Sequence, residues 1–141
     1  MASTTICSTF VIQNALLASR LWRKAGNHLS IHGISLTEYL VMQYLNDAPQ
    51  KAVARIELAE HMAMSASGIT RLIAPLEKIK LVEKEANPRD ARQSLVKLSK
   101  TGQRVYQEAS VSFEHIASDM VGHLSEAQLT KVLEVYGRLG R

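Results

Sequence analysis

Small and polar side chains recur between residues 65 and 74, interleaved with large apolar ones. Hydroxyl groups can bond to bases or phosphates, and a guanidinium can bond to guanine O6 and N7 at once or hold a phosphate. This chemistry fits contact with nucleic acid. The residues concerned are Ser65, Ala66, Ser67, Thr70, Arg71 and Ala74.

The apolar residues between them have helical spacing. Ile69, Leu72, Ile73 and Leu76 follow an i, i+3, i+4, i+7 pattern, which predicts a helix to about Ile79 with one buried face. Ser65 can cap its start, where unpaired N–H groups form a seat for a phosphate. The polar residues then lie on the outer face, and the B-DNA major groove, about 12 Å wide, admits one such helix.

A β-hairpin is predicted directly after this helix. Residues 81–85 and 95–98 alternate between apolar and polar, and residues 86–90 have the composition of a turn. Arg89 lies near the tip, where it can enter a narrow minor groove. Arg92 has two open interpretations, a second DNA contact or an internal brace with Asp90.

Five further helices complete the predicted fold, which is mainly α with a small β-hairpin wing. A helix at 55–62, a short turn and the helix from Ser65 form a winged helix-turn-helix over residues 34–100. Residues 1–33 and 101–141 are predicted to form N-terminal and C-terminal dimerisation helices. The remaining helices are expected at 5–28, from a Thr37 cap to about 47, at 101–121 after a Ser99 cap, and from Ser125, which with Gln128 fits a capping box.

Charge and composition limit the class of protein. The 141 residues carry a formal net charge of +4, and residues 51–104 hold eleven basic against six acidic residues. A basic middle segment suits a polyanion, although an ordinary solvated surface remains an alternative. No apolar run approaches a membrane span, and the basic residues follow the apolar stretch 10–18 instead of preceding it, unlike a secretory signal. We expect a cytoplasmic protein without contact to a membrane.

Few residues suggest catalysis, a cofactor or a metal. Cys7 is the single cysteine, which excludes an intramolecular disulfide and a cysteine-based zinc site. His28 and His32 could chelate a metal only if one helix continued through Gly26 and Ser30. Because no nucleophile–base arrangement or phosphate-binding glycine loop is visible, we predict no enzyme, cofactor or metal.

The chain resembles the MarR (multiple antibiotic resistance regulator) family. The likeness covers nearly the whole sequence and is carried by the segments 58–60, 65–76, 81–83, 87–92, 98–102 and 124–129. It implies a homodimer whose first, fifth and sixth helices interlock, duplex DNA bound at a pseudo-palindrome, and regulation by a small aromatic or phenolic ligand or by oxidation. By the same resemblance, Trp22, Tyr39, Met42 and Tyr106 are candidates to line a ligand pocket, with core packing as the alternative.

Three residues depart from the family pattern. Ala63 lies in the turn before the helix from Ser65, and Lys80 follows that helix, at positions where the family often has glycine. If either residue needs a positive φ, the strain costs on the order of 1 kcal/mol. Pro75 lies inside the helix and should kink it.

The flanking helices carry more apolar residues than one small lobe can cover, which favours a dimer. We predict a sequence-specific, ligand-responsive repressor that binds DNA as a homodimer. Two alternatives remain: a repressor of the same family that senses oxidants through Cys7, and a winged-helix module that binds protein. The apolar residues concerned are Ile6, Phe10, Ile116, Met120, Leu129, Val132, Leu133 and Tyr136.

Overall fold

The computed structural model describes residues 4–140 as an assembly of helices with one small sheet. The elements follow in the order α1 (Ile6–Leu29), the 3₁₀ turn η1 (Ser30–His32), α2 (Leu36–Asp47), β1 (Ala52–Ala54), α3 (Arg55–His61), α4 (Ala66–Lys78), β2 (Val82–Ala86), β3 (Ser94–Leu98), α5 (Lys100–Val121) and α6 (Glu126–Tyr136). No helix within residues 4–140 is both long and apolar enough to cross a membrane.

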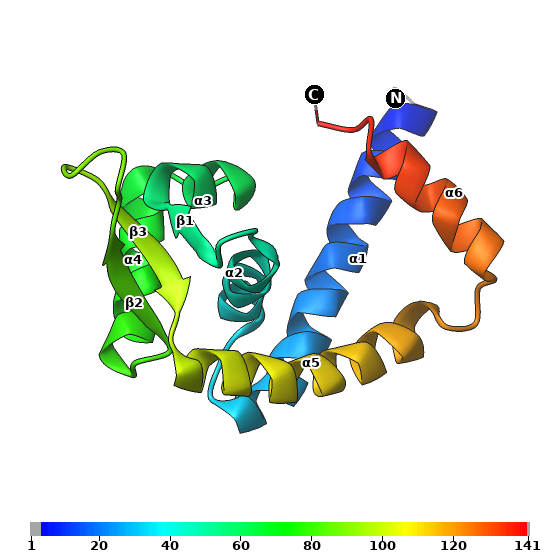
Figure 1. Cartoon of the computed structure of the whole chain (residues 1–141). Coiled ribbons are helices and arrows are strands. Elements are labelled where there is room, and N and C mark those ends of the chain that lie inside the picture. Colours follow the sequence, from blue (N-terminus) through cyan, green and yellow to red (C-terminus); the bar gives the residue numbers. More distant parts are fainter. Residues whose placement is uncertain (1–3, 141) are drawn as a thin grey trace.

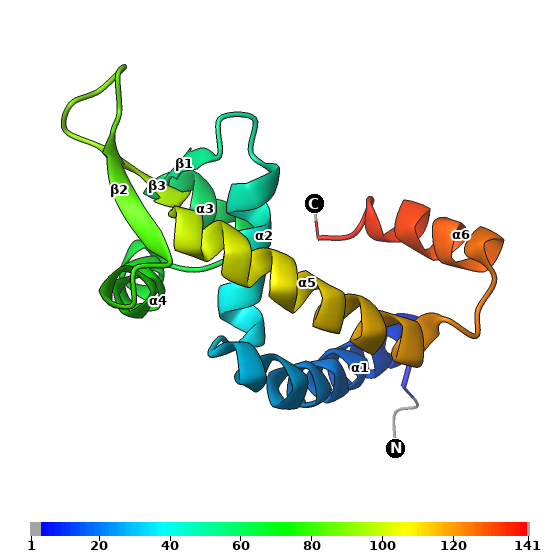
Figure 2. The ribbon, with the colours of Figure 1, turned by 60° about the horizontal axis from the view of Figure 1, so that its bottom comes forward.

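The molecule has two unlike ends. At one end, α2, α3, α4 and the sheet gather into a lobe, from which the β2–β3 hairpin projects (Figure 1). At the other end, α1 crosses α5, and α6 turns back from the end of α5 toward the start of α1. Figure 2 shows α5 connecting the two ends. The chain therefore combines a winged helix-turn-helix with an extended helical region.

Serine side chains begin most of the helices. Ser65, Ser99 and Ser125 each accept a hydrogen bond from the backbone N–H three residues later, as predicted. The prediction for α2 was wrong. Ser35, not Thr37, caps this helix, because Ser35 and Glu38 form a reciprocal capping box.

The hairpin pairs as predicted, with one strand that the pattern did not indicate. Strand β3 lies in the middle of the order β1–β3–β2 and pairs antiparallel with both neighbours. Val53 of β1 faces Val96, and both side chains are buried. Because β1 has only three residues, it offers too short an alternation to be recognised.

The core lies beneath α4 and extends between α1 and α5. Ile69, Ile73 and Leu76 of α4 are buried, whereas Leu72 is half-buried. Ile116 is also buried, at 1% exposure, and Met120 packs against the core. This corrects the prediction that both residues belong to an uncovered outer surface: they face the core within one chain.

Candidate nucleic-acid interface

The outer face of α4 is exposed along its length. Ser65, Ala66, Ser67, Thr70, Arg71 and Ala74 all have exposed side chains, opposite the buried Ile69, Ile73 and Leu76. None of the ion pairs found within residues 4–140 involves Arg71. The helix thus buries one face and presents hydroxyl and guanidinium groups on the other.

Two hydroxyl groups at the start of α4 are held by the backbone. The Ser65 Oγ accepts the Gly68 N–H at 3.0 Å, and the Thr70 Oγ1 donates to the Ala66 carbonyl at 3.1 Å. The Ser65 and Ser67 hydroxyls lie 3.2 Å apart. Because the Thr70 proton is directed back along the helix, its oxygen lone pairs remain available to accept from a base amino group.

The turns at both ends of α4 adopt the left-handed conformation. Ala63, before the helix, has φ 53°, and Lys80, after it, has φ 63°. These are the two positions where the sequence lacks the expected glycine. A side chain in this region of φ is strained by about 1–2 kcal/mol.

The wing places its two arginines differently. The Arg89 side chain is exposed near the tip, where the Asn87 Oδ1 accepts the Arg89 backbone N–H at 3.0 Å. The Arg92 Nε lies 3.4 Å from the Asp90 Oδ1, which also accepts the Arg92 backbone N–H at 3.0 Å. The Arg92 side chain is nevertheless 92% exposed. The brace therefore exists, and it does not remove the Arg92 side chain from the surface.

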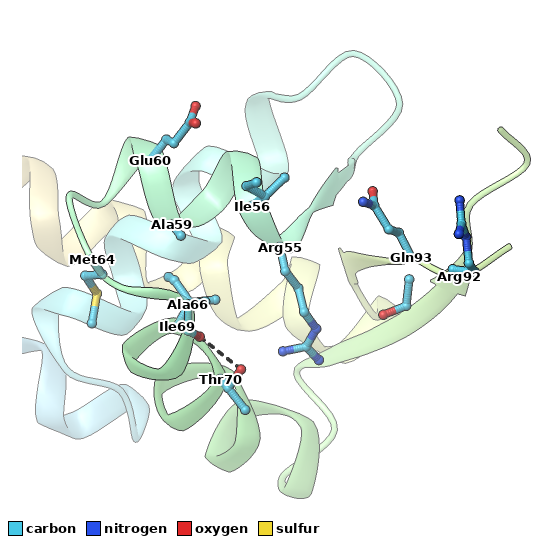
Figure 3. Close-up of a pocket in the computed structure, with 11 residues that line it drawn as sticks. Arg55, Ile56, Ala59, Glu60, Met64, Ala66, Ile69, Thr70, Arg92 and Gln93 are labelled. Carbon is cyan, nitrogen blue, oxygen red and sulfur yellow. Dashed lines mark hydrogen bonds between the residues drawn. The ribbon is translucent and has the colours of Figure 1, made fainter. Parts of the chain in front are cut away.

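A cavity of about 540 Å³ lies between α3, α4 and the base of the wing (Figure 3). Its floor is apolar, and its rim carries two guanidinium groups. It is lined by Arg55, Ile56, Ala59, Glu60, Met64, Ala66, Ile69, Thr70, Arg92, Gln93 and Ser94. The sequence did not indicate Arg55, Ile56, Glu60 or Gln93 as site residues, because they lie beside α4 only once α3 and the wing pack around it.

The predicted ligand-pocket residues are dispersed. Tyr39 and Met42 are buried in the core, and Trp22 is exposed on α1. Tyr39 stacks on Tyr106 and on Phe113, with ring centroids 5.3 and 4.7 Å apart. Burial raises the pKa of both tyrosines. The structure thus brings together Tyr39 and Tyr106 but leaves Trp22 on the surface.

The two histidines considered for a metal are engaged separately. The His28 Nδ1–H donates to the Lys24 carbonyl at 2.9 Å, and the His32 Nε2 lies 2.7 Å from the Ser112 Oγ on α5. Helix α1 ends between them, at Leu29. Within the part of the chain that the structure describes, no three histidine, cysteine or acidic side chains lie close enough to hold a metal.

Cys7 lies exposed in the first turn of α1, where it borders a shallow depression with Ser8, Val11 and Ile12. No basic side chain lines this depression. The structure places the thiol where an oxidant could reach it, and a role in sensing stays a prediction.

Comparison with known proteins finds a family match for the middle of the chain and one similar curated protein. The model of the MarR family matches residues 32–93, which run from η1 to the wing. The HTH-type transcriptional regulator MhqR of Bacillus subtilis (strain 168) is 22% identical over 129 residues, covering 89% of this chain and 88% of that protein. The segment from η1 to the wing is therefore similar to the MarR family.

Solved MarR-family structures share the fold over nearly the whole chain. Sco3205, a MarR-family regulator from Streptomyces coelicolor in complex with DNA, superposes with a TM-score of 0.83 at 21% identity, covering 96% of this chain and 87% of that one. A mutant of E. coli MarR complexed with operator DNA gives a TM-score of 0.80 at 17% identity, covering 98% and 100%. The long α1 and the α5–α6 pair are therefore part of the MarR fold.

Proposed function

We propose that this chain is a transcriptional regulator of the MarR family and binds duplex DNA in a sequence-specific manner, with α4 in the major groove and the wing at the adjacent minor groove. The observation that carries the proposal is the division of α4 into a buried aliphatic face and an exposed face with Thr70 and Arg71. The comparison structures support it, since Sco3205 and E. coli MarR are described in complex with DNA.

The positions of the candidate residues on α4 and the wing suggest which part of the DNA each one contacts. Arg71 lies on the outer face of α4, where it can reach a guanine edge, and Thr70 can accept from a base. Ser65 and Ser67 lie at the helix start, where phosphate contacts orient a recognition helix. Arg89 at the wing tip reaches the minor groove, and Arg92 follows it there if Asp90 releases it.

The functional unit in this proposal is a homodimer. Helix α6 buries no residue within its own chain, and its Leu133 is 67% exposed. A short helix of this kind is not stable in water without packing. Along α1, Ile6 is 86% exposed, and Phe10 and Leu17 are also exposed. A second copy covering α1 and α6 buries these groups and places two α4 helices about 34–36 Å apart, one turn of DNA.

We further propose repression as the outcome of binding, because a dimer seated on a promoter excludes other proteins from the same groove. A small aromatic or phenolic effector is the expected signal, and the Tyr39–Tyr106 stack between α2 and α5 is where it would be sensed. Here the support is the resemblance of the sequence alone.

Binding to a duplex at increasing salt tests the proposal. A dimer that touches six to ten phosphates should lose about 10³–10⁵ in affinity between 50 and 200 mM salt. Arg71→Ala should cost about 1–3 kcal/mol on a selected sequence, whereas Arg89→Ala should weaken binding with less dependence on sequence. Affinity indifferent to salt and to both changes would instead support a module that binds protein.

A further inference from the structure

The first residue of α3 is tied to the last turn of α4. The Arg55 Nη2 donates to the Glu77 Oε1 at 2.7 Å, across 22 positions of sequence. The side chains are 26% and 30% exposed, so the pair lies largely outside bulk solvent. Charge-assisted hydrogen bonds of this length are stronger and more directional than neutral ones.

This ion pair is distinctive among those of the described residues. The other five lie within the wing, between the wing strands, along α5, or between α1 and α5. Only Arg55–Glu77 connects the two helices of the helix-turn-helix. At their other end, α3 and α4 are joined by the turn through Ala63, whose φ of 53° is strained.

Pro75 interrupts the backbone hydrogen bonding of α4 shortly before Glu77. Pro75 has no N–H, so it leaves the Arg71 carbonyl without the helical hydrogen bond it would otherwise accept. The hydrogen bond between residues 71 and 75 is therefore absent from the last two turns of α4. Helices bend most readily at a proline. A fixed contact at Glu77 holds the segment that follows this weak point.

We propose that Arg55 is a positioning residue, which acts through Glu77 to set the angle at which α4 presents Thr70 and Arg71. The inference deepens the proposed function and rests on it. Figure 3 shows the Arg55 side chain extending from the start of α3 toward α4, on the side where Thr70 lies. The Arg55 guanidinium therefore connects α3 to α4 at the edge of the surface proposed to contact DNA.

A direct contact is the competing role for Arg55. Its side chain lines the same cavity as Arg92 and Thr70, so it could leave Glu77 for a phosphate. The two roles predict opposite effects of Glu77→Gln. If Glu77 positions α4 through Arg55, its loss weakens binding; if Glu77 only competes with a phosphate for Arg55, its loss strengthens binding.

Affinity measurements on a duplex selected by the wild-type protein from a random-sequence pool separate these roles. We expect Arg55→Met and Glu77→Gln each to weaken binding about tenfold, with the double variant no weaker than either single one. The double variant Arg55→Glu/Glu77→Arg, which exchanges the two charges, should recover most of the lost DNA affinity. The salt slope should stay unchanged in Arg55→Met, whereas a direct phosphate contact would lower it by about 0.9 for each copy.

A second ion pair serves as a control for the general effect on DNA affinity of removing one positive charge. Arg104 and Glu108 face each other at 3.9 Å along α5, and both side chains are exposed. Arg104→Met removes the same charge without uncoupling α3 from α4, so it should leave affinity for the selected duplex within about twofold. Stronger binding by Glu77→Gln, or a reduced salt slope in Arg55→Met, would overturn the positioning role.

The distance between α3 and α4 tests the positioning role of Arg55 in the absence of DNA. Spin labels at Glu60→Cys on α3 and Lys78→Cys on α4, both exposed positions, report the angle between the helices in a Cys7→Ser background. We expect the distance distribution to broaden in Arg55→Met and Glu77→Gln and to narrow again in the exchanged pair. Unchanged distributions would overturn the inference. If the wild-type protein selects no duplex, the proposed function fails, and the distances still decide the role of Arg55.

Discussion

The Cα of Gly102 lies directly against the carbonyl oxygen of Leu81, leaving no room for a methyl group between them. The same carbonyl accepts the Ser99 backbone N–H at 3.0 Å, and the Ser99 Oγ donates to the Lys80 carbonyl at 2.6 Å. These contacts join the start of α5 to the segment that follows α4. The Leu98–Gly102 segment therefore connects the winged helix-turn-helix lobe to the helices proposed to dimerise.

Gly102→Ala should destabilise the protein because the new methyl group would overlap the Leu81 backbone. We expect the free energy of unfolding in urea to fall by about 1–3 kcal/mol. Gly26→Ala is the matched control. It lies inside α1, and beyond its chain neighbours and the backbone of that helix no atom lies within 4 Å of the added carbon, so the change should raise stability by about 0.5–1 kcal/mol. Equal stability of the two variants would contradict the close contact.

Lys80→Gly should stabilise the protein. Lys80 has φ 63°, a conformation that glycine adopts without strain, so the free energy of unfolding should rise by about 1 kcal/mol. Lys78→Gly, two residues earlier within α4, should lower it by about 1 kcal/mol, because glycine is a poor helix former. A loss of stability in both variants would show that Lys80 is not strained.

The sequence predicted the elements that rest on local chemistry. The spacing of Ile69, Ile73 and Leu76 predicted both faces of α4, and the serine caps marked where three helices begin. It did not predict what depends on distant partners. Arg55 meets Glu77 across 22 positions, and Ile116 turns toward the core because α1 crosses α5. A periodic pattern shows that a face is apolar, but it does not show which element covers that face.

Alkaline pH should lower the free energy of unfolding of the protein, because Tyr39 is buried. Burial, followed by the nearby Tyr106, raises the pKa of Tyr39 above its ordinary value of 10. The folded state then keeps a proton that the unfolded chain loses, so stability is complete below pH 10 and falls as the pH rises beyond it. In Tyr39→Phe, the decline above pH 10 should be shallower in denaturant unfolding, though still present because the pKa of Tyr106 is also raised by burial. An identical decline would contradict this.

Leu133→Glu should dissociate the proposed dimer. Leu133 is 67% exposed on α6, and a carboxylate there would be buried without a partner when a second copy covers the helix. Light scattering should show the mass falling from twice 15.6 kDa to a single chain. Ile79→Glu serves as the control, since Ile79 is 52% exposed at the end of α4, away from α1 and α6. A wild-type chain that is monomeric at working concentration would exclude the dimer itself.

Selection of bound duplexes from a random-sequence pool tests most directly whether α4 reads DNA. We expect a palindrome whose half-sites are centred about one helical turn, 10–10.5 base pairs, apart. We also expect Arg71→Ala to relax the preference at one base pair in each half-site. A pool without enriched sequences, or an enriched sequence that Arg71→Ala recovers unchanged, would contradict it.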